Sequence, residues 1–403
     1  MSALRKHVEN NDFILRVNSC CTPLERIHNA SILCRNGMIQ VIGGYSALRV
    51  LEDIPCVDMS DYHAVPGLLD THLHGSGGFA SMDADSNSDL THISRVLAEH
   101  GVTSFVLTVL SSPPEKMIAV IRALAEKFDE ELPGAVPVGI HVEGPFLNVE
   151  RRGAQSASDI KAVDLSMAED LFQAGGGAVK TMTFAPELDD SDKLIEKCLE
   201  HNVIPSMGHS MAQERDVLRA IEVGAARCTH LFNGMPPLSQ RRTDLTSVGL
   251  TDDRLTIELI VDGVHVHPRM IDLACRCKPR ANVIGISDAT QGAGLHDGTY
   301  HLGRDKVQIE HGVCRRVFDG KLAGSCLTLD QALRNLGKFS SLPEEQILSC
   351  FTQNAAKSLN YNDRGVIRPG KRADIVVMDE NWNVQMTIVN GRIVFDRAED
   401  LED

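Results

Sequence analysis

The sequence has no apolar stretch near the ~18 residues that a membrane-spanning helix requires. Residues 1–11 are too charged to form the core of a secretory signal peptide. Basic residues are not in surplus, since 40 Lys and Arg stand against 55 Asp and Glu, for a net charge of −15. Nothing resembles a basic stripe that could displace counterions from phosphates. We therefore expect a cytoplasmic protein with no membrane or nucleic-acid partner.

Paired cysteines are missing as well. The 11 cysteines are odd in number and scattered, and no CxxC pair occurs, which argues against a disulfide framework and a thiolate zinc ribbon. We expect reduced thiols, most of them buried. With 43% hydrophobic and 24% charged residues, the composition is that of an ordinary globular protein with a sizeable core. The 16 histidines are the more informative excess.

The two ends of the chain share a β-hairpin character. Short alternating segments over residues 12–17, 30–35 and 38–42 are separated by Asn36-Gly37 and Gly43-Gly44. Near the other end, apolar segments flank the turn at Asn390-Gly391. We predict one small β-sandwich domain built from residues 1–65 and 363–403.

Residues 66–362 alternate β-branched apolar runs with helical patterns, which is typical of βαβ units and a parallel sheet. The eight candidate strands span residues 64–70, 103–109, 137–142, 179–184, 203–207, 226–230, 255–261 and 282–287. This number of units predicts an α/β fold of the (β/α)8, TIM-like barrel type. A doubly wound sheet is the alternative.

Potential metal ligands follow five of the eight candidate strands. Each of them alone fits a satisfied rim histidine or a helix cap. Because parallel strands of a barrel end at one mouth, however, we expect these side chains to converge there. They are His72, His74, Glu143, His209, His230 and Asp288.

Nitrogen and oxygen ligands without thiolate suit zinc or another divalent transition metal, and six groups are enough for two ions. Between two ions, a bridging water would become hydroxide at neutral pH. A carboxylate such as Asp288 can take the proton from this nucleophile and pass it to the leaving group. The residues therefore indicate metal-assisted hydrolysis.

Seven short motifs lie along the chain: HVEGPF at 141–146, FAPE at 184–187, GHS at 208–210, HLFNGM at 230–235, DGVH at 262–265, SDAT at 287–290 and LAGS at 322–325. With these motifs, the chain resembles the amidohydrolase superfamily and, within it, the N-acetylglucosamine-6-phosphate deacetylases. The resemblance runs from PGLLD at 66–70 to PGKRAD at 369–374. Many amidohydrolases bridge two metals with a carboxylated lysine after strand four, whereas Glu143 after strand three fits the deacetylase pattern.

The resemblance implies a role for each matching residue. Glu143, His209 and His230 would hold the principal metal, and His72 and His74 match members that hold a second one. Asp288 would be the general base and acid. His265 would contact the sugar and help to polarise the acetamide carbonyl. Asn233, the backbone N–H of Gly234 and Arg241 would bind the phosphate, although the adjacent Arg242 could serve in place of Arg241. The resemblance also implies a homodimer.

Two positions depart from the family pattern. Gln155 stands where the family usually has a histidine that contacts the sugar, and glutamine can form hydrogen bonds but cannot carry charge. This departure affects the identity of the sugar rather than metal binding. Gly234 stands where alanine is common, and its backbone N–H is retained.

Three functions are compatible with these features. The first is a metal-dependent deacetylase, with one or two ions per chain, zinc foremost, that acts on N-acetylglucosamine 6-phosphate or a close N-acetylhexosamine 6-phosphate and releases acetate and the amino sugar phosphate. The second is an amidohydrolase for another amide, either cyclic or N-acetylgalactosamine 6-phosphate; Asn233 and Arg241 argue against an uncharged cyclic substrate. The third is a non-catalytic interaction protein, which we expect to have lost ligands, whereas all six are present.

Overall fold

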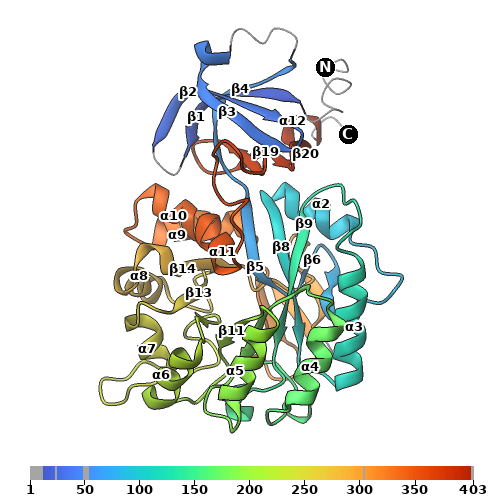
Figure 1. Ribbon diagram of the computed structural model, residues 1–403, viewed down its shortest axis with the longest axis vertical. Coiled ribbons are helices and arrows are strands. Elements are labelled where there is room, and N and C mark those ends of the chain that lie inside the picture. The colour runs from blue at the N-terminus through green and yellow to red at the C-terminus, as the bar shows by residue number, and fades with distance from the viewer. Residues whose placement is uncertain (1–11, 23–24, 49–53, 303–304, 401–403) are drawn as a thin grey trace.

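The computed structural model describes residues 12–22, 25–48, 54–302 and 305–400. The chain forms a strand-and-helix barrel and a smaller sheet beyond one end of it (Figure 1). Within the described ranges, no helix is both long and apolar enough to cross a membrane. All 11 cysteines fall within these ranges, and all are free.

Eight parallel strands form the central sheet, in the order β14-β13-β12-β11-β10-β9-β8-β5. Asp288 N–H donates to His72 O over 3.0 Å, and Leu73 bridges to Ala289, so the first and last strands meet. The barrel is therefore confirmed over the open doubly wound sheet. The strands are β5 (Leu68–Leu73), β8 (Val102–Leu110), β9 (Val136–Glu143), β10 (Val179–Phe184), β11 (Ile204–Met207), β12 (Arg227–Cys228), β13 (Thr256–Ile260) and β14 (Val283–Ile286).

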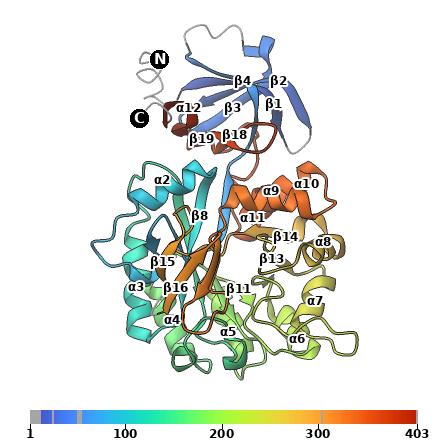
Figure 2. The same cartoon turned by 180° about the vertical axis from the view of Figure 1, so that it is seen from behind.

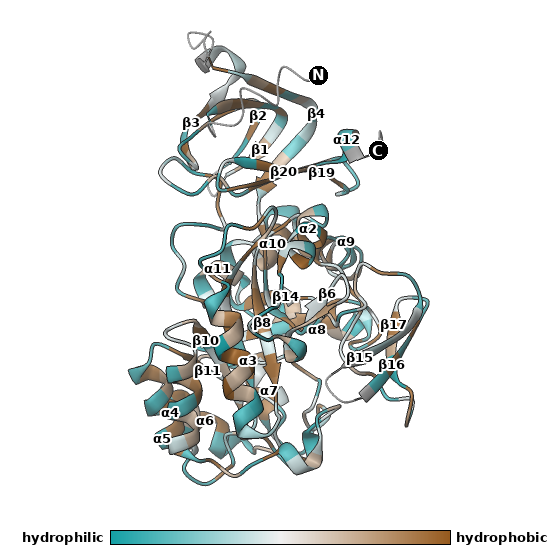
Figure 3. Cartoon of the chain, turned by 90° about the vertical axis from the view of Figure 1, so that its right-hand side faces the viewer, coloured by the Kyte–Doolittle hydropathy of each residue, from teal (hydrophilic) through white to brown (hydrophobic). Residues whose placement is uncertain are grey.

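Amphipathic helices cover the barrel. In α6, Val217, Ala220 and Ile221 are buried at helical spacing. A capping box between Gln213 and Asp216 provides hydrogen-bond acceptors for backbone N–H groups at the start of this helix. Figure 3 shows hydrophilic and hydrophobic colours on α3, α4 and α6. The helices are α2 (Thr91–Glu99), α3 (Pro114–Glu126), α4 (Leu165–Ala174), α5 (Ser191–Glu200), α6 (Glu214–Val223), α7 (Leu245–Thr251), α8 (Pro268–Cys277), α9 (Leu329–Phe339), α10 (Glu344–Phe351) and α11 (Gln353–Ser358).

Strands from both ends of the chain form one seven-stranded sheet, in the order β20-β19-β18-β4-β1-β2-β3. Antiparallel pairing of β18 with β4 joins the two ends. The predicted limits of the domains, 1–65 with 363–403 and 66–362, stay a prediction. The strands are β1 (Phe13–Cys21), β2 (Arg26–Arg35), β3 (Met38–Gly44), β4 (Cys56–Pro66), β18 (Ile375–Met378), β19 (Val384–Val389) and β20 (Arg392–Asp396).

The terminal sheet packs on the barrel end where the parallel strands begin. Gly67 N–H, just before β5, donates to Asp374 O over 2.9 Å. Thr387 Oγ1 donates to Ala98 O, at the end of α2, over 2.7 Å. The opposite end of the barrel, where the strands finish, is therefore free of this sheet.

Between β14 and α9 in the sequence, the chain forms a three-stranded antiparallel sheet. This sheet lies beside the barrel (Figure 2). Its strands are β15 (Gly298–Leu302), β16 (Asp305–Glu310) and β17 (Val313–Arg316). Ala323 N–H donates to Cys314 O, which links this sheet to the segment that pairs with Ala289 through Ser325. The remaining short elements are β6 (Gly75–Ser76), β7 (Phe79–Ala80), α12 (Arg397–Asp400) and the 3₁₀ helices η1 (Tyr45–Leu48), η2 (Ser81–Asp83), η3 (Val149–Arg151), η4 (Ala157–Asp159) and η5 (Arg280–Asn282).

Candidate metal centre and active site

Glu143, His209 and His230 form one cluster of buried ligand atoms at the barrel mouth. Glu143 ends β9, and the two histidines follow β11 and β12. Glu143 Oε1 lies 2.9 Å from His209 Nε2 and 3.1 Å from His230 Nε2, and the two Nε2 atoms are 3.1 Å apart. Three such atoms could together hold one divalent metal ion.

His72, His74 and Asp288 form a second buried cluster. Asp288 Oδ1 lies 3.0 Å from His74 Nε2 and 3.4 Å from His72 Nε2. His74 Nε2 is also 3.7 Å from Glu143 Oε2, so the two clusters adjoin. The structure thus brings together all six residues that the sequence singles out as ligands.

The polar atoms of these clusters fit a cation. His209 Nδ1 donates to Arg151 O over 2.7 Å, so Nε2, the atom that faces Glu143, is the nitrogen that would offer its lone pair to a metal. His72 Nε2 and Asp288 Oδ1 are buried without a hydrogen-bond partner among the described residues. A divalent metal would give these atoms a partner. Without one, the free-energy cost of removing them from water is not offset.

Unusual backbone conformations direct three of these side chains into the mouth. His209, His230 and Asp288 have φ values of 48°, 30° and 49°. Left-handed conformations are uncommon for residues other than glycine and cluster at functional sites. Each lies just after a barrel strand, where the chain turns sharply from the sheet into the mouth.

The histidines of the clusters favour the ionised form of both carboxylates. Burial by itself would raise the pKa of Glu143, but the neighbouring His209 and His230 hold it well below the usual range. Burial also opposes ionisation of Asp288, whose pKa is nevertheless lowered by His74 and His72. A carboxylate at position 288 is the form that can accept a proton.

His265 and Gln155, the residues expected to contact the sugar, are both largely buried. His265 Nδ1 donates to Asp262 Oδ2 over 2.6 Å. Burial lowers the pKa of His265, but Asp262 outweighs this effect and raises it. Gln155 Oε1 accepts from Ser111 N–H over 3.1 Å, whereas its Nε2 has no partner among the described residues and can donate to a ligand.

The expected phosphate-binding residues lie on the loop after β12. Asn233 Nδ2 donates to His230 O over 3.3 Å. A Cβ atom on Gly234 would lie 2.8 Å from His209 Nδ1, so the common alanine would crowd the first cluster. Arg241 and Arg242 are exposed, and neither forms an ion pair in the part of the chain that the structure describes. The structure therefore does not choose between the two arginines.

Sequence analysis missed Glu258 and Arg227, which are buried inside the barrel beneath the clusters. Glu258 Oε2 accepts from His72 Nδ1 over 3.1 Å, and Arg227 forms an ion pair with the same carboxylate. Burial raises the pKa of Glu258, but Arg227 and His72 hold it well below its usual range. A charged residue within the apolar run of β13 was the signal that could have revealed it.

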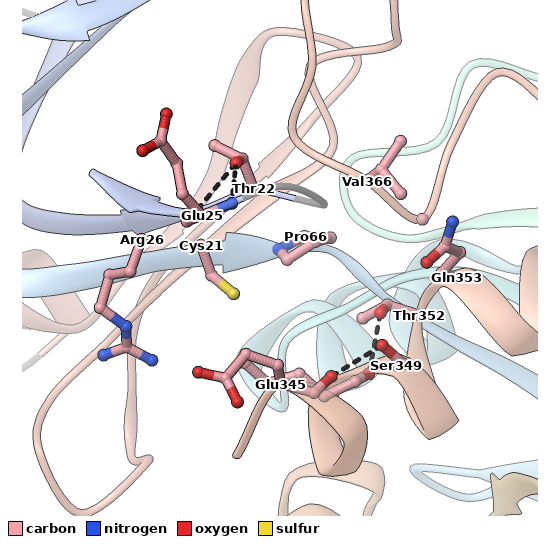
Figure 4. A pocket seen from close by; sticks show the side chains of 12 residues that line it. Cys21, Thr22, Glu25, Arg26, Pro66, Glu345, Ser349, Thr352, Gln353 and Val366 are labelled. Carbon is pink, nitrogen blue, oxygen red and sulfur yellow. Dashed lines mark hydrogen bonds between the residues drawn. The ribbon is translucent and has the colours of Figure 1, made fainter. Parts of the chain in front are cut away.

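A surface pocket lies elsewhere, between the terminal sheet and α10 (Figure 4). Cys21, Arg26, Pro66 and Glu345 are among its lining residues. Ser349 Oγ donates to the backbone carbonyl of Glu345 over 2.7 Å. The pocket contains no member of the two clusters, so we do not assign the chemistry to it.

A closed (β/α)8 barrel with His, Glu and Asp clusters at its strand ends defines a hydrolase of the metal-dependent class. The Amidohydrolase family model matches residues 63–394. N-acetylglucosamine-6-phosphate deacetylase of Bacillus subtilis is 36% identical over 340 residues, which are 83% of this chain and 85% of that protein. The chain therefore belongs to the amidohydrolase family and, within it, to the N-acetylglucosamine-6-phosphate deacetylases.

Two further comparisons support this assignment. N-acetylgalactosamine-6-phosphate deacetylase of Escherichia coli O157:H7 is 31% identical, with coverage of 86% of this chain and 92% of that protein. The structure of N-acetyl-D-glucosamine-6-phosphate deacetylase of Mycobacterium smegmatis, in complex with N-acetyl-D-glucosamine-6-phosphate, is similar with a TM-score of 0.88 and 28% identity. That match covers 95% of this chain and 99% of the other.

Proposed function

We propose that the protein hydrolyses the acetamide of N-acetylglucosamine 6-phosphate, a linear amide, to acetate and the amino sugar 6-phosphate. The observation that carries this proposal is the pair of adjoining ligand clusters, with Asp288 facing both histidines of the second one. The relatives named above act on substrates of this kind. The protein would work in the cytoplasm as a homodimer.

One or two divalent ions per chain, zinc foremost, would serve as cofactor. Glu143, His209 and His230 would hold the principal ion, and His72, His74 and Asp288 the second. The donor set of imidazoles and carboxylates without thiolate supports zinc or a similar metal. When bound, such a metal polarises the amide carbonyl and makes a coordinated water more acidic.

The residues around the clusters would handle the proton and the substrate. Asp288 accepts the proton of the attacking water on its carboxylate and returns it to the amine nitrogen as the C–N bond breaks. His265, which Asp262 orients through Nδ1, donates from Nε2 to the acetamide oxygen. Asn233, Gly234 N–H and Arg241 or Arg242 bind the phosphate, because clustered donors suit its oxygens.

A second candidate substrate differs from the first in its sugar. Gln155 replaces the usual histidine and has a free, buried Nε2 donor, so the contact it offers to the sugar differs from the family pattern. A deacetylase of N-acetylgalactosamine 6-phosphate is among the relatives, at 31% identity. This epimer is therefore the alternative substrate.

Acetate release from a substrate panel tests the proposal. The panel contains N-acetylglucosamine 6-phosphate, N-acetylgalactosamine 6-phosphate, unphosphorylated N-acetylglucosamine and a cyclic amide. We expect release from a phosphorylated sugar and a kcat/KM at least ~100-fold lower without phosphate, because charge-assisted contacts are lost. Preference for the unphosphorylated sugar, or ring opening of the cyclic amide alone, would contradict the proposal.

A further inference from the structure

Glu258 forms a hydrogen bond with one residue of each ligand cluster. It lies within β13 and is 2% exposed. Its Oε2 atom accepts from His72 Nδ1 and from the backbone N–H of His230, each over 3.1 Å. One carboxylate oxygen therefore touches a residue of each cluster, although Glu258 belongs to neither.

We propose that Glu258 is the positioning residue that organises both clusters for metal binding. This inference rests on the proposed function, because it concerns the metals that the clusters would hold. It assigns Glu258 two tasks: to fix the tautomer of His72 and to hold the backbone of His230. Arg227 supports both tasks by pairing with the carboxylate.

The first task follows from hydrogen-bond chemistry. An ionised carboxylate only accepts, so the hydrogen of a neutral His72 must be on Nδ1. The lone pair is then on Nε2, the atom that faces Asp288 at 3.4 Å and has no hydrogen-bond partner among the described residues. Partners of this kind orient a histidine ring and make it a better metal ligand.

The second task concerns the backbone of His230. Its φ of 30° is unfavourable for a residue with a Cβ atom, so surrounding contacts must hold it. The hydrogen bond from its N–H to Glu258 is one such contact, while its Nε2 reaches Glu143 at 3.1 Å. A shift of Glu258 would thus move a ligand of each cluster.

Arg227 explains how a charged residue can occupy this position. Its side chain is 1% exposed, and its Nη2 atom donates to both Glu258 Oε1 and Thr71 Oγ1. A buried carboxylate stays charged only when it is paired. If the pair served only to stabilise the barrel, its replacement would leave metal affinity unchanged.

Zinc affinity of the Glu258→Gln variant tests the inference, since glutamine keeps the size of the side chain and loses its charge. Competition titration with a zinc-binding dye should give two sites in the wild type and a ~10- to 100-fold weaker affinity of at least one site in the variant. Wild-type affinity at both sites in Glu258→Gln would overturn the inference, as would a wild-type protein that binds only one ion. Acetate release by the wild type is scored separately and reports on the proposed function alone.

Asp330→Asn is the matched control. Asp330 Oδ1 lies 3.1 Å from His100 Nδ1 and its other oxygen 2.8 Å from Arg334 Nη2, so a carboxylate also meets a histidine and an arginine here, outside the clusters. Its zinc affinity should equal that of the wild type. Weakening by the same factor as in Glu258→Gln would show a general effect of losing a buried carboxylate and would overturn the inference.

The Glu258→Gln variant could fail to fold, because it leaves Arg227 unpaired. In that case, two further measurements still test the inference. The double variant Arg227→Met/Glu258→Gln removes both charges, and it should also bind zinc more weakly; wild-type affinity would overturn the inference. In the metal-free wild type, ¹⁵N shifts of the histidine rings, recorded at a pH at which His72 is neutral and assigned with His72→Asn, should show its hydrogen on Nδ1. A neutral ring with its hydrogen on Nε2 would overturn the inference as well.

Discussion

His72 and His141 show how the partners of a buried histidine decide its use. Their rings lie 4.5 Å apart, centre to centre, inside the barrel. His141 meets Thr108 Oγ1 at 3.2 Å and Thr183 Oγ1 at 2.7 Å, so both of its nitrogens are occupied. Burial, together with the nearby His72, keeps its pKa well below the usual range. His72 has one free nitrogen and is suited to bind a metal, whereas His141 is a structural residue.

Asp288 carries the clearest prediction at the residue scale. Asp288→Asn keeps the shape of the side chain but removes the carboxylate that, in the proposed function, would accept the proton of the attacking water. General acid–base contributions are typically ~10²- to 10⁴-fold, so kcat should fall within or beyond this range. Steady-state kinetics, with metal content checked by elemental analysis, measures the effect, and Asp330→Asn should keep the wild-type kcat.

A different result would reassign the role of Asp288. If the variant kept more than a tenth of the wild-type kcat at equal metal content, Asp288 would only cap the turn after β14. His265 would then become the candidate for proton transfer.

Among the elements, the barrel strands were the most predictable from the sequence. All eight follow from apolar runs, because strands buried on both faces lose their alternation and become continuous, as β8 does over Val102–Leu110. The strand predicted over residues 226–230 is shorter, since β12 ends at Cys228 and the chain turns at His230 with φ of 30°. The six ligands were predictable because strand ends share one mouth.

Other features depend on contacts that no local pattern encodes. The sheet of β15 to β17 was not predicted, since its short strands are held by pairing with one another and by contacts of β17 with Leu322 and Ala323. Helices α10 and α11 are separated at Thr352, whose φ of −131° and ψ of −89° end α10. The contact of Glu258 with His72 joins residues 186 positions apart, so only the closed barrel reveals it.

Gly285 provides a prediction at the scale of two packed elements, β14 and α10. A Cβ atom at this position would lie 2.0 Å from Cε1 of the buried Phe351. Gly285→Ala should therefore lower the free energy of unfolding by about 1–3 kcal/mol, the usual cost of overpacking a core. Urea unfolding measures the change.

Gly44→Ala is the control, because its added Cβ would meet only Asn29 O at 3.9 Å. Its unfolding midpoint should remain close to that of the wild type. Equal midpoints for the Gly285 and Gly44 variants would contradict the packing of β14 against Phe351.

At the scale of the whole molecule, the ligand clusters and the terminal sheet lie at opposite ends of the barrel. The terminal sheet is anchored where the strands begin, through Gly67 and Thr387. The ligand clusters lie where the strands finish. A net charge of −15 would repel a sugar phosphate at long range, so local cations must create an attractive field at the mouth. Histidines, metal and the exposed Arg241 and Arg242 would supply it.

The most direct test of the central claim is acetate release from N-acetylglucosamine 6-phosphate before and after zinc is returned to metal-free protein. A metal held by the two clusters would polarise the carbonyl and acidify the water, so stripping it should reduce kcat to below about a hundredth. Up to two equivalents of zinc per chain should restore the rate, matching the two clusters. Undiminished acetate release by protein that elemental analysis shows to be free of metal would contradict the account.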